Sequence, residues 1–207
     1  MKLMLKLEFF FDCSSPWTYL AFSRIHSIAE KNKIKIDWKP ILVGGVFNEV
    51  NNEIYENRSN PNPVKFKYSR KDLKDWAELC DIKINWPSIF PVKAVKMMRA
   101  AIVAVEEGCI VPYSWKCFQS YWELDKDLNN DDVLRDIILS SGMDADKVFD
   151  LINTERIKDH LKFNTSNLIE RGGFGSPTIF INESDMYFGN DRLELVNFKI
   201  EKLIKDF

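Results

Sequence analysis

The stretch from Phe9 to Leu20 constrains the fold of this chain more than any other. Three consecutive phenylalanines lead into Asp-Cys-Ser-Ser, and Pro16 then opens a segment whose apolar residues recur at helical spacing. Proline favours the first helical position, because its φ is already helical and no intrahelical partner exists there for the N–H it lacks. The pattern predicts a strand, a short loop and a helix. Ser15 then lies at a helix N-terminus, where it either caps the helix or helps to hold an anion.

The remaining elements follow from periodicity. Alternating apolar residues predict strands over residues 3–11 and 34–38, on either side of a helix that stops near residue 32, which makes a right-handed βαβ unit with parallel strands. The Gly-, Asn- and Pro-rich residues 44–66 predict an irregular loop. Helical spacing covers residues 68–79, 92–107, 111–124 and, after an N-cap at Asn130, 131–141. A helix over about 154–170, a hairpin of residues 178–181 and 186–188, and an amphipathic helix complete the chain.

This order predicts an α/β fold that is split by an all-helical insertion. We expect residues 1–45 and 154–207 to form one domain and residues 46–153 to form the helical insertion domain. A net charge of -2 gives no reason to expect nucleic acid or a membrane surface as a partner. Neither a signal peptide nor a membrane-spanning run is recognisable, so we expect a cytoplasmic protein.

The thiols and imidazoles exclude several classes of site. The four cysteines form no Cys-x-x-Cys pair and no metal-ligand spacing, so we expect reduced thiols, most of them buried, and no metal. The two histidines lie in no zinc or hydrolase-triad pattern. Disulfide exchange needs a thiol pair at the helix start, where this chain has Ser15-Pro16-Trp17-Thr18.

Four segments together resemble a known family over nearly the whole chain. They are Phe11-Asp12-Cys13-Ser14-Ser15-Pro16-Trp17-Thr18-Tyr19-Leu20, Lys65 with Tyr68 and Asp72, Phe174-Gly175-Ser176-Pro177-Thr178, and Phe188-Gly189-Asn190-Asp191-Arg192-Leu193. The chain is similar to the 2-hydroxychromene-2-carboxylate isomerases and the kappa-class glutathione transferases, which have a DsbA-like thioredoxin fold. The last segment is closer to the isomerase form. The resemblance implies a thioredoxin-like fold, glutathione as cofactor and a homodimer.

The resemblance also implies roles at the start of the first helix and at the later proline. Ser15 matches the catalytic serine whose hydroxyl donates a hydrogen bond to the glutathione sulfur, and the positive end of a helix favours the thiolate. The backbone of Ser176 would pair with the cysteinyl backbone of glutathione, as if adding a strand to an edge. Pro177 is expected in the cis form, although only ~5% of X-Pro bonds are cis.

Further glutathione contacts are implied at both ends of the tripeptide. Asn190 and Asp191 match residues at its γ-glutamyl end, with Asp191 meeting the ammonium, and Arg192 either contacts a carboxylate or holds the loop. Lys65 matches a lysine for a glutathione carboxylate. Its partner asparagine is Asn57 or Asn60, of which we favour Asn60.

Three further positions in the matched segments have alternative roles. Asp72 is as readily a surface acid as a site residue. Cys13 and Ser14 stand where the family commonly has apolar residues, so Ser14 competes with Ser15 for the sulfur, while Cys13 is expected to be a buried thiol.

The expected function is a glutathione-dependent isomerase that interconverts 2-hydroxychromene-2-carboxylate and trans-o-hydroxybenzylidenepyruvate, or acts on a close analogue. The alternatives are a kappa-like glutathione transferase that conjugates small electrophiles and a non-catalytic glutathione-binding module. Aromatic residues near Trp86 and Phe90 either line the substrate site or belong to the core.

Overall fold

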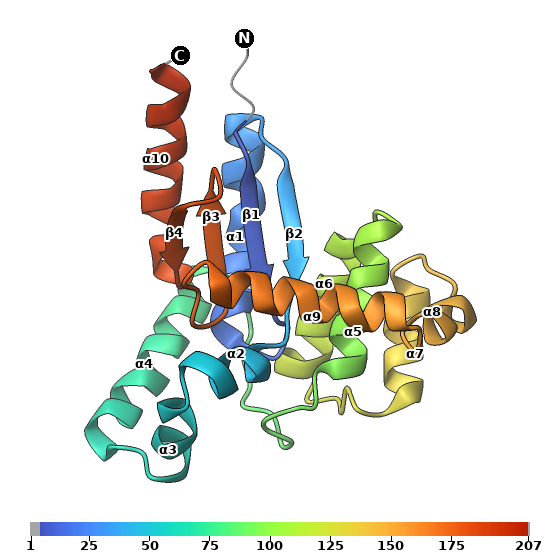
Figure 1. The fold of residues 1–207 in the computed structure, drawn as a ribbon. Helices are drawn as coiled ribbons and strands as arrows, with labels where there is room; N and C mark the ends of the chain where they lie inside the picture. Colours follow the sequence, from blue (N-terminus) through green and yellow to red (C-terminus); the bar gives the residue numbers. More distant parts are fainter. Residues whose placement is uncertain (1–4, 207) are drawn as a thin grey trace.

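The computed structural model describes residues 5–206 (Figure 1). The strands are β1 (Leu7–Phe11), β2 (Ile36–Pro40), β3 (Thr178–Ile181) and β4 (Asp185–Phe188). The α-helices are α1 (Pro16–Asn32), α2 (Val43–Val50), α3 (Glu53–Ser59), α4 (Pro63–Leu79), α5 (Val95–Glu106), α6 (Ile110–Phe118), α7 (Asp131–Ser140), α8 (Ala145–Leu151), α9 (Glu155–Glu170) and α10 (Leu193–Lys205). A π-helical turn, η1 (Gln119–Glu123), follows α6, and a 3₁₀ turn, η2 (Asn190–Arg192), precedes α10.

The four strands form one sheet in the order β2-β1-β3-β4. β1 pairs parallel with β2 and antiparallel with β3, and β3 pairs antiparallel with β4. The predicted βαβ unit and C-terminal hairpin are therefore confirmed. Of the predicted first strand, residues 3 and 4 lie outside the described residues, and β1 itself begins at Leu7.

The side chains of β1 pack against different helices on the two faces of the sheet, because successive strand residues point to opposite sides. Leu7, Phe9 and Phe11 belong to the main core with residues of α1, α5 and α10. Phe10 lies on the other face, in a smaller cluster with residues of α2 and α9. Each residue of β1 is buried, so both faces of the sheet are covered and the end of this strand is held in place.

The prediction of an irregular loop over residues 44–66 is wrong. α2 and α3 occupy most of it, and α4 begins at Pro63, five residues before the predicted helix. Gly44 and Gly45 lower intrinsic helix propensity, but packing overrides it. A Cβ on Gly45 would lie 3.3 Å from a side-chain carbon of α9, so the glycine permits the close approach of α2 to α9. Asn62 caps α4, accepting from the N–H groups of the second and third helical residues at 3.1 and 3.2 Å.

Two further elements differ from the sequence patterns. The predicted helix over residues 111–124 is divided into α6 and η1, and α8 was not predicted. The π-helical turn brings Trp122 to the loop between β1 and α1, where its indole Nε1 donates to the carbonyl of Cys13 at 3.1 Å. The predicted cap of α7 is confirmed, since Asn130 accepts from the Asp132 N–H at 2.8 Å.

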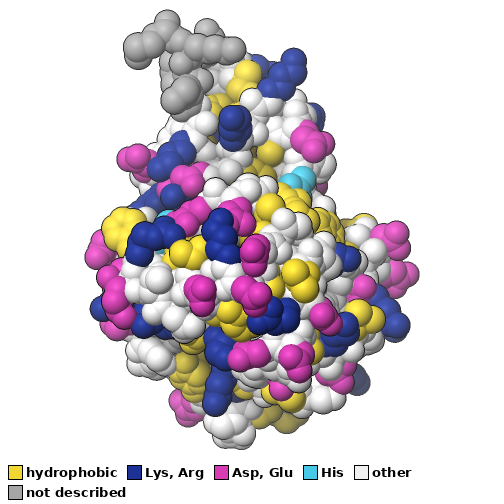
Figure 2. All heavy atoms as spheres, turned by 90° about the vertical axis from the view of Figure 1, so that its right-hand side faces the viewer, with side chains coloured by type: hydrophobic (Ala, Val, Ile, Leu, Met, Phe, Trp, Pro, Cys, Tyr) yellow, Lys and Arg dark blue, Asp and Glu magenta, His cyan; other side chains and the backbone are white. Residues whose placement is uncertain are grey.

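The inserted helices and the sheet share one core. A continuous hydrophobic cluster contains residues of β1 and α1 together with residues of α5 to α8. The domain boundaries at residues 45/46 and 153/154 stay a prediction. Within residues 5–206, no helix is both long and apolar enough to cross a bilayer. On the face shown in Figure 2, acidic and basic side chains are interspersed.

Candidate active site

Ser15 is the N-cap of α1, as the sequence predicts. Its φ and ψ are −103° and 123°, and its Oγ accepts from the Thr18 N–H at 3.3 Å, while Pro16 occupies the first turn. The same hydroxyl donates to the carbonyl oxygen of Ser176 at 3.2 Å. One alcohol thus lies at the positive end of a 17-residue helix, within hydrogen-bond distance of the chain segment before β3.

Ser176 and the loop after β1 are joined by a second set of contacts. The peptide bond between Ser176 and Pro177 is cis, which confirms the predicted isomer. The Ser176 hydroxyl accepts from the Asp12 N–H at 3.0 Å and lies 2.7 Å from the Thr18 hydroxyl. Because Ser176 is buried, these bonds fix its backbone relative to the start of α1. The two motifs, 161 positions apart in sequence, therefore form one site.

The Asp12 side chain stabilises the loop between β1 and α1. Its carboxylate oxygens accept from the N–H groups of Ser14 and Val43, each at 2.9 Å, so it connects the end of β1 to the start of α2. Burial raises the pKa of Asp12, an effect that these backbone hydrogen bonds oppose.

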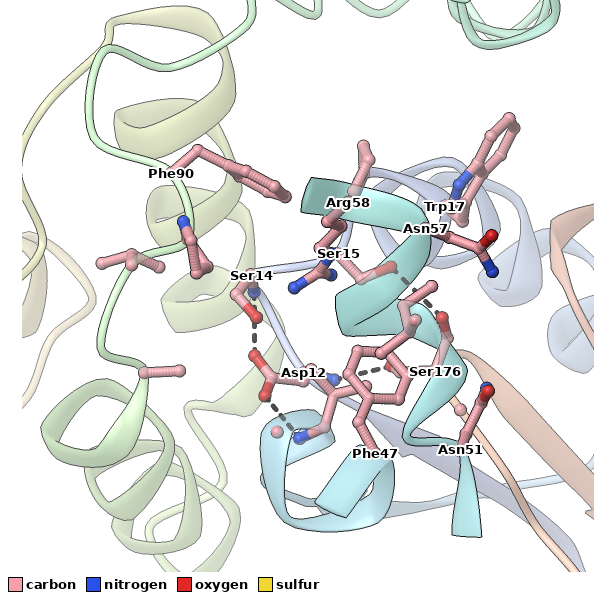
Figure 3. A pocket seen from close by; sticks show the side chains of 18 of the residues that line it. Asp12, Ser14, Ser15, Trp17, Phe47, Asn51, Asn57, Arg58, Phe90 and Ser176 are labelled. Atoms are coloured by element: carbon pink, nitrogen blue, oxygen red, sulfur yellow. Dashed lines mark hydrogen bonds between the residues drawn. The ribbon is translucent and has the colours of Figure 1, made fainter. Parts of the chain in front are cut away.

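These residues lie on the wall of a cavity of about 900 Å³ (Figure 3). Its lining comes from the loop after β1, from α2, α3 and α4, from residues 86–95 and from the segment before β3. The lining side chains that the figure labels are Asp12, Ser14, Ser15, Trp17, Phe47, Asn51, Asn57, Arg58, Phe90 and Ser176. Aromatic rings and small polar groups therefore share one surface, an arrangement typical of small-molecule sites.

The other predicted residues are placed differently. Asn57 lines the cavity, whereas Asn60, the asparagine favoured from the sequence, is the C-cap of α3 and is not among the lining residues within 5–206. Lys65 is exposed in the first turn of α4 and is likewise not among those lining residues. Of the two asparagines, the structure thus brings Asn57 to the cavity.

The segment after β4 flanks α1. Asn190 is buried, and its backbone carbonyl accepts a hydrogen bond from the Arg24 guanidinium. The side-chain Nδ2 of Asn190 is buried without an acceptor in the described part of the chain. Asp191 pairs with its neighbour Arg192 at 3.3 Å on the surface, and the role of Arg192 stays a prediction. None of these three residues, nor Pro177, is among the described residues that line the cavity.

Cys13 is fully buried, as expected from the sequence. Burial raises the pKa of its thiol, and the neighbouring Cys117 raises it further. Ser14 lies at the cavity wall beside Ser15, so the structure keeps both hydroxyls in reach of a ligand there. Ser14 as an alternative partner of the sulfur stays a prediction.

Sequence patterns missed several lining residues. Arg58 and Phe47 lie in the segment that was predicted as a loop, and Arg70 lies in α4. No sequence motif includes Phe47 or Arg58. They come near Ser15 only because α2 and α3 pack beside the loop between β1 and α1. Trp86 and Phe90 both line the cavity. The sequence had left open whether these rings belong to the core or to the substrate site.

The family model of the DSBA-like thioredoxin domain matches residues 6–201. The chain belongs to this family. A 2-hydroxychromene-2-carboxylate isomerase from Pseudomonas sp. (strain C18) is 28% identical over 194 residues, which cover 92% of this chain and 88% of the relative. Glutathione S-transferase kappa 1 from Rattus norvegicus is 24% identical over 206 residues, covering 93% of this chain and 89% of the relative.

Solved structures agree on the fold. A structure of 2-hydroxychromene-2-carboxylate isomerase superposes with a TM-score of 0.81 at 23% identity and covers 97% of this chain and 96% of its own. A probable DsbA oxidoreductase from Streptomyces coelicolor superposes with a TM-score of 0.78 at 12% identity, covering 96% of this chain and 89% of its own. The resemblance stated from the sequence motifs and the thioredoxin-like fold are thereby confirmed.

Proposed function

We propose that this protein is a glutathione-dependent isomerase that interconverts 2-hydroxychromene-2-carboxylate and trans-o-hydroxybenzylidenepyruvate, or acts on a close analogue. The observation that carries the proposal is the position of Ser15. Its hydroxyl stands at the N-terminus of α1, 3.2 Å from the carbonyl before a cis-proline, on the wall of a cavity of about 900 Å³. A hydroxyl and a helix N-terminus together stabilise a thiolate over a thiol.

The residues present fit glutathione. The Ser176 carbonyl now accepts from Ser15, so it is a backbone acceptor that a peptide N–H can take over. Asn190 carries a buried amide nitrogen without an acceptor in the described chain, which suits the polar γ-glutamyl end. When bound, glutathione would supply a thiolate nucleophile for reversible addition to the substrate, the chemistry that isomerisation by bond rotation and elimination needs, and it would not be consumed.

In the proposed mechanism, Ser15 turns its hydroxyl from the Ser176 carbonyl toward the sulfur and stabilises negative charge there by a hydrogen bond. Ser176 is held by Asp12 and Thr18, so its backbone orients the tripeptide without moving. The aromatic lining, including Phe47 and Phe90, excludes water from the reacting carbon atoms.

The second candidate is a kappa-like glutathione transferase, favoured by the similarity to kappa-class relatives. The thiolate would be the same, but the product would be a conjugate. The test is incubation with 2-hydroxychromene-2-carboxylate and, separately, with 1-chloro-2,4-dinitrobenzene, while glutathione is measured. Isomerase activity predicts product without loss of glutathione. Glutathione consumed in step with product would assign the transferase, and glutathione binding without turnover of either compound would leave a binding module.

Glutathione contacts at the glycyl end are part of the proposal. We assign the asparagine contact to Asn57 rather than Asn60, because Asn57 lines the cavity. Asn57→Ala is expected to weaken glutathione binding about 10- to 100-fold, the loss of one hydrogen bond to a charged group. Asn60→Ala is the matched control, and calorimetry measures both. A larger loss from Asn60→Ala would reverse the assignment.

The remaining contacts follow from the resemblance. Lys65 would meet a carboxylate of glutathione, Asp191 its ammonium and Arg192 a carboxylate or the loop itself. A homodimer, a cytoplasmic location and a role in the breakdown of aromatic compounds complete the proposal.

A further inference from the structure

Arg58 is held between two aromatic rings at the cavity. Its guanidinium carbon lies 5.4 Å from the ring centroid of Phe47 in α2 and 5.3 Å from that of Phe90 in the segment before α5. A cation over an aromatic face is attracted by the negative potential of the ring, by about 0.5–2 kcal/mol. Two such contacts position the guanidinium without neutralising its charge.

Arg70 repeats the arrangement at the same cavity. Its guanidinium carbon lies 4.4 Å from the ring centroid of Trp86 and 5.9 Å from that of Phe66. The rings of Trp86 and Phe90 are in turn 4.6 Å apart, so the two arginines are linked through neighbouring rings. The cavity therefore presents two guanidinium groups among aromatic side chains.

Arg58 has no carboxylate partner within residues 5–206. Arg135, Arg156 and Arg171 each have one, at 2.5–2.6 Å. The acidic residue among the lining residues is Asp12, whose two oxygens already accept backbone N–H groups. Arg58 is exposed to solvent on one side, and its partial burial against the rings lowers the pKa of its guanidinium, yet an arginine stays charged at neutral pH. A cation without a carboxylate partner on the wall of a largely apolar cavity favours an anionic ligand.

The guanidinium points toward the reacting end of the cavity. Figure 3 shows Arg58 reaching from α3 toward the loop that carries Ser14 and Ser15. A ligand group on Arg58 therefore lies on the same side as the sulfur that Ser15 would stabilise. A planar guanidinium binds a carboxylate through two parallel N–H donors, which fixes orientation as well as position.

We propose that Arg58 binds the carboxylate of the acceptor substrate and thereby makes the site selective for aromatic carboxylic acids over their uncharged analogues. The identification of an acceptor rests on the proposed function, whereas carboxylate binding at Arg58 does not. Phe47 and Phe90 hold the guanidinium in place and offer their remaining surface to the aromatic part of the substrate.

The first test uses binding alone. Calorimetry compares trans-cinnamate with trans-cinnamamide, which share a shape and differ in charge, on the wild-type protein and on Arg58→Gln. We expect the wild type to bind cinnamate more tightly, and Arg58→Gln to raise the Kd of cinnamate about 10- to 100-fold, as for the loss of a charge-assisted hydrogen bond, without changing the Kd of cinnamamide. Arg58→Lys, which keeps the charge but not the fork, is expected to fall between them.

Arg135→Gln is the matched control. Arg135 also stacks on a phenylalanine, Phe149, at 5.1 Å, and pairs with Asp146, but it is not among the lining residues in the described chain. Its substitution is expected to leave both Kd values unchanged. Equal thermal melting of Arg58→Gln and the wild type establishes that the variant is folded.

Three results would overturn the proposal. If the wild type binds cinnamate and cinnamamide with equal affinity, or binds neither, there is no carboxylate site at Arg58. Equal weakening of both ligands in Arg58→Gln means that the arginine only supports packing. A loss of glutathione affinity in Arg58→Gln with an unchanged Kd for cinnamate assigns the arginine to glutathione. If cinnamate behaves as expected but the chromene is not isomerised, the carboxylate site stands and the isomerase proposal alone fails.

Discussion

Removing the Ser15 hydroxyl should raise the pKa of the thiol of bound glutathione. The hydroxyl makes one donor bond, at 3.2 Å to the Ser176 carbonyl, and in the proposed complex that bond is transferred to sulfur. A hydrogen bond to a charged group contributes about 1.5–3 kcal/mol. Since one pKa unit corresponds to about 1.4 kcal/mol, its loss raises the thiol pKa by about 1–2 units. At neutral pH the thiolate fraction, and kcat with it, falls by up to about 100-fold.

The same side chain also caps α1, accepting from the Thr18 N–H at 3.3 Å, so the substitution has to separate the two roles. Alanine at a cap costs about 1 kcal/mol of stability, whereas glycine costs a few tenths. Ser15→Gly therefore removes the sulfur contact with little loss of the cap. Ser15→Ala should raise the thiol pKa equally and, in addition, lower the free energy of unfolding by about 1 kcal/mol.

The assay is an ultraviolet titration of the thiolate on the protein with saturating glutathione, beside denaturant unfolding of each variant. Ser14→Ala is the discriminating variant, because Ser14 lies at the same wall. A thiol pKa unchanged in Ser15→Gly would refute the assignment of the sulfur contact. A rise in Ser14→Ala without one in Ser15→Gly would transfer the role to Ser14.

Two further predictions concern the fold beneath the site. Burial alone would raise the pKa of Glu8, but hydrogen bonds from Arg171, at 2.6 Å, and from a lysine hold this pKa below its ordinary value. The contribution of Glu8 to stability is therefore present above the unfolded pKa of about 4.3 and is lost as the pH falls through the folded pKa. Arg171→Met should lower the free energy of unfolding by about 3 kcal/mol at pH 7, the low end for breaking a buried ion pair, because the lysine still contacts Glu8. Urea unfolding should show this deficit shrinking as the pH falls from the raised pKa of Glu8 in the variant to the lowered pKa of Glu8 in the wild type; a deficit independent of pH would contradict this. Gly173→Ala should cost about 1–3 kcal/mol in the same assay, because its Cβ would meet buried Leu168 at 2.2 Å, whereas the control Gly44→Ala, with no atom within 4 Å, should be neutral or stabilising.

Much of the fold could be predicted from local patterns. Pro16 marked the start of α1, Asn130 marked the start of α7, and alternation from Leu7 to Phe11 marked the central strand. These signals are short-range, since a cap or a two-residue period depends on neighbouring residues only. The prediction failed where long-range packing decides, as at Gly44, which reads as a helix breaker but lies in α2.

The candidate site divides in the same way. Ser15 and Ser176 could be named from the sequence, because each lies in a segment that resembles the isomerase and kappa-transferase family. The asparagine proposed to contact glutathione could not be named from the sequence. Asn57 and Asn60 are three positions apart, and only the direction of α3 brings Asn57 to the cavity. Arg58 has no motif at all.

The sequence by itself determined a strand-loop-helix with a capped start, a later proline before a strand, the split α/β order and a family. Only the tertiary structure decided that the Ser15 hydroxyl meets the Ser176 carbonyl, that η1 turns Trp122 onto the loop between β1 and α1, and that Arg58 lies between Phe47 and Phe90. The physical reason is the distance along the chain over which each kind of interaction acts. Capping and alternation act between residues a few positions apart, whereas cavity walls are assembled by packing of segments that are distant in the chain.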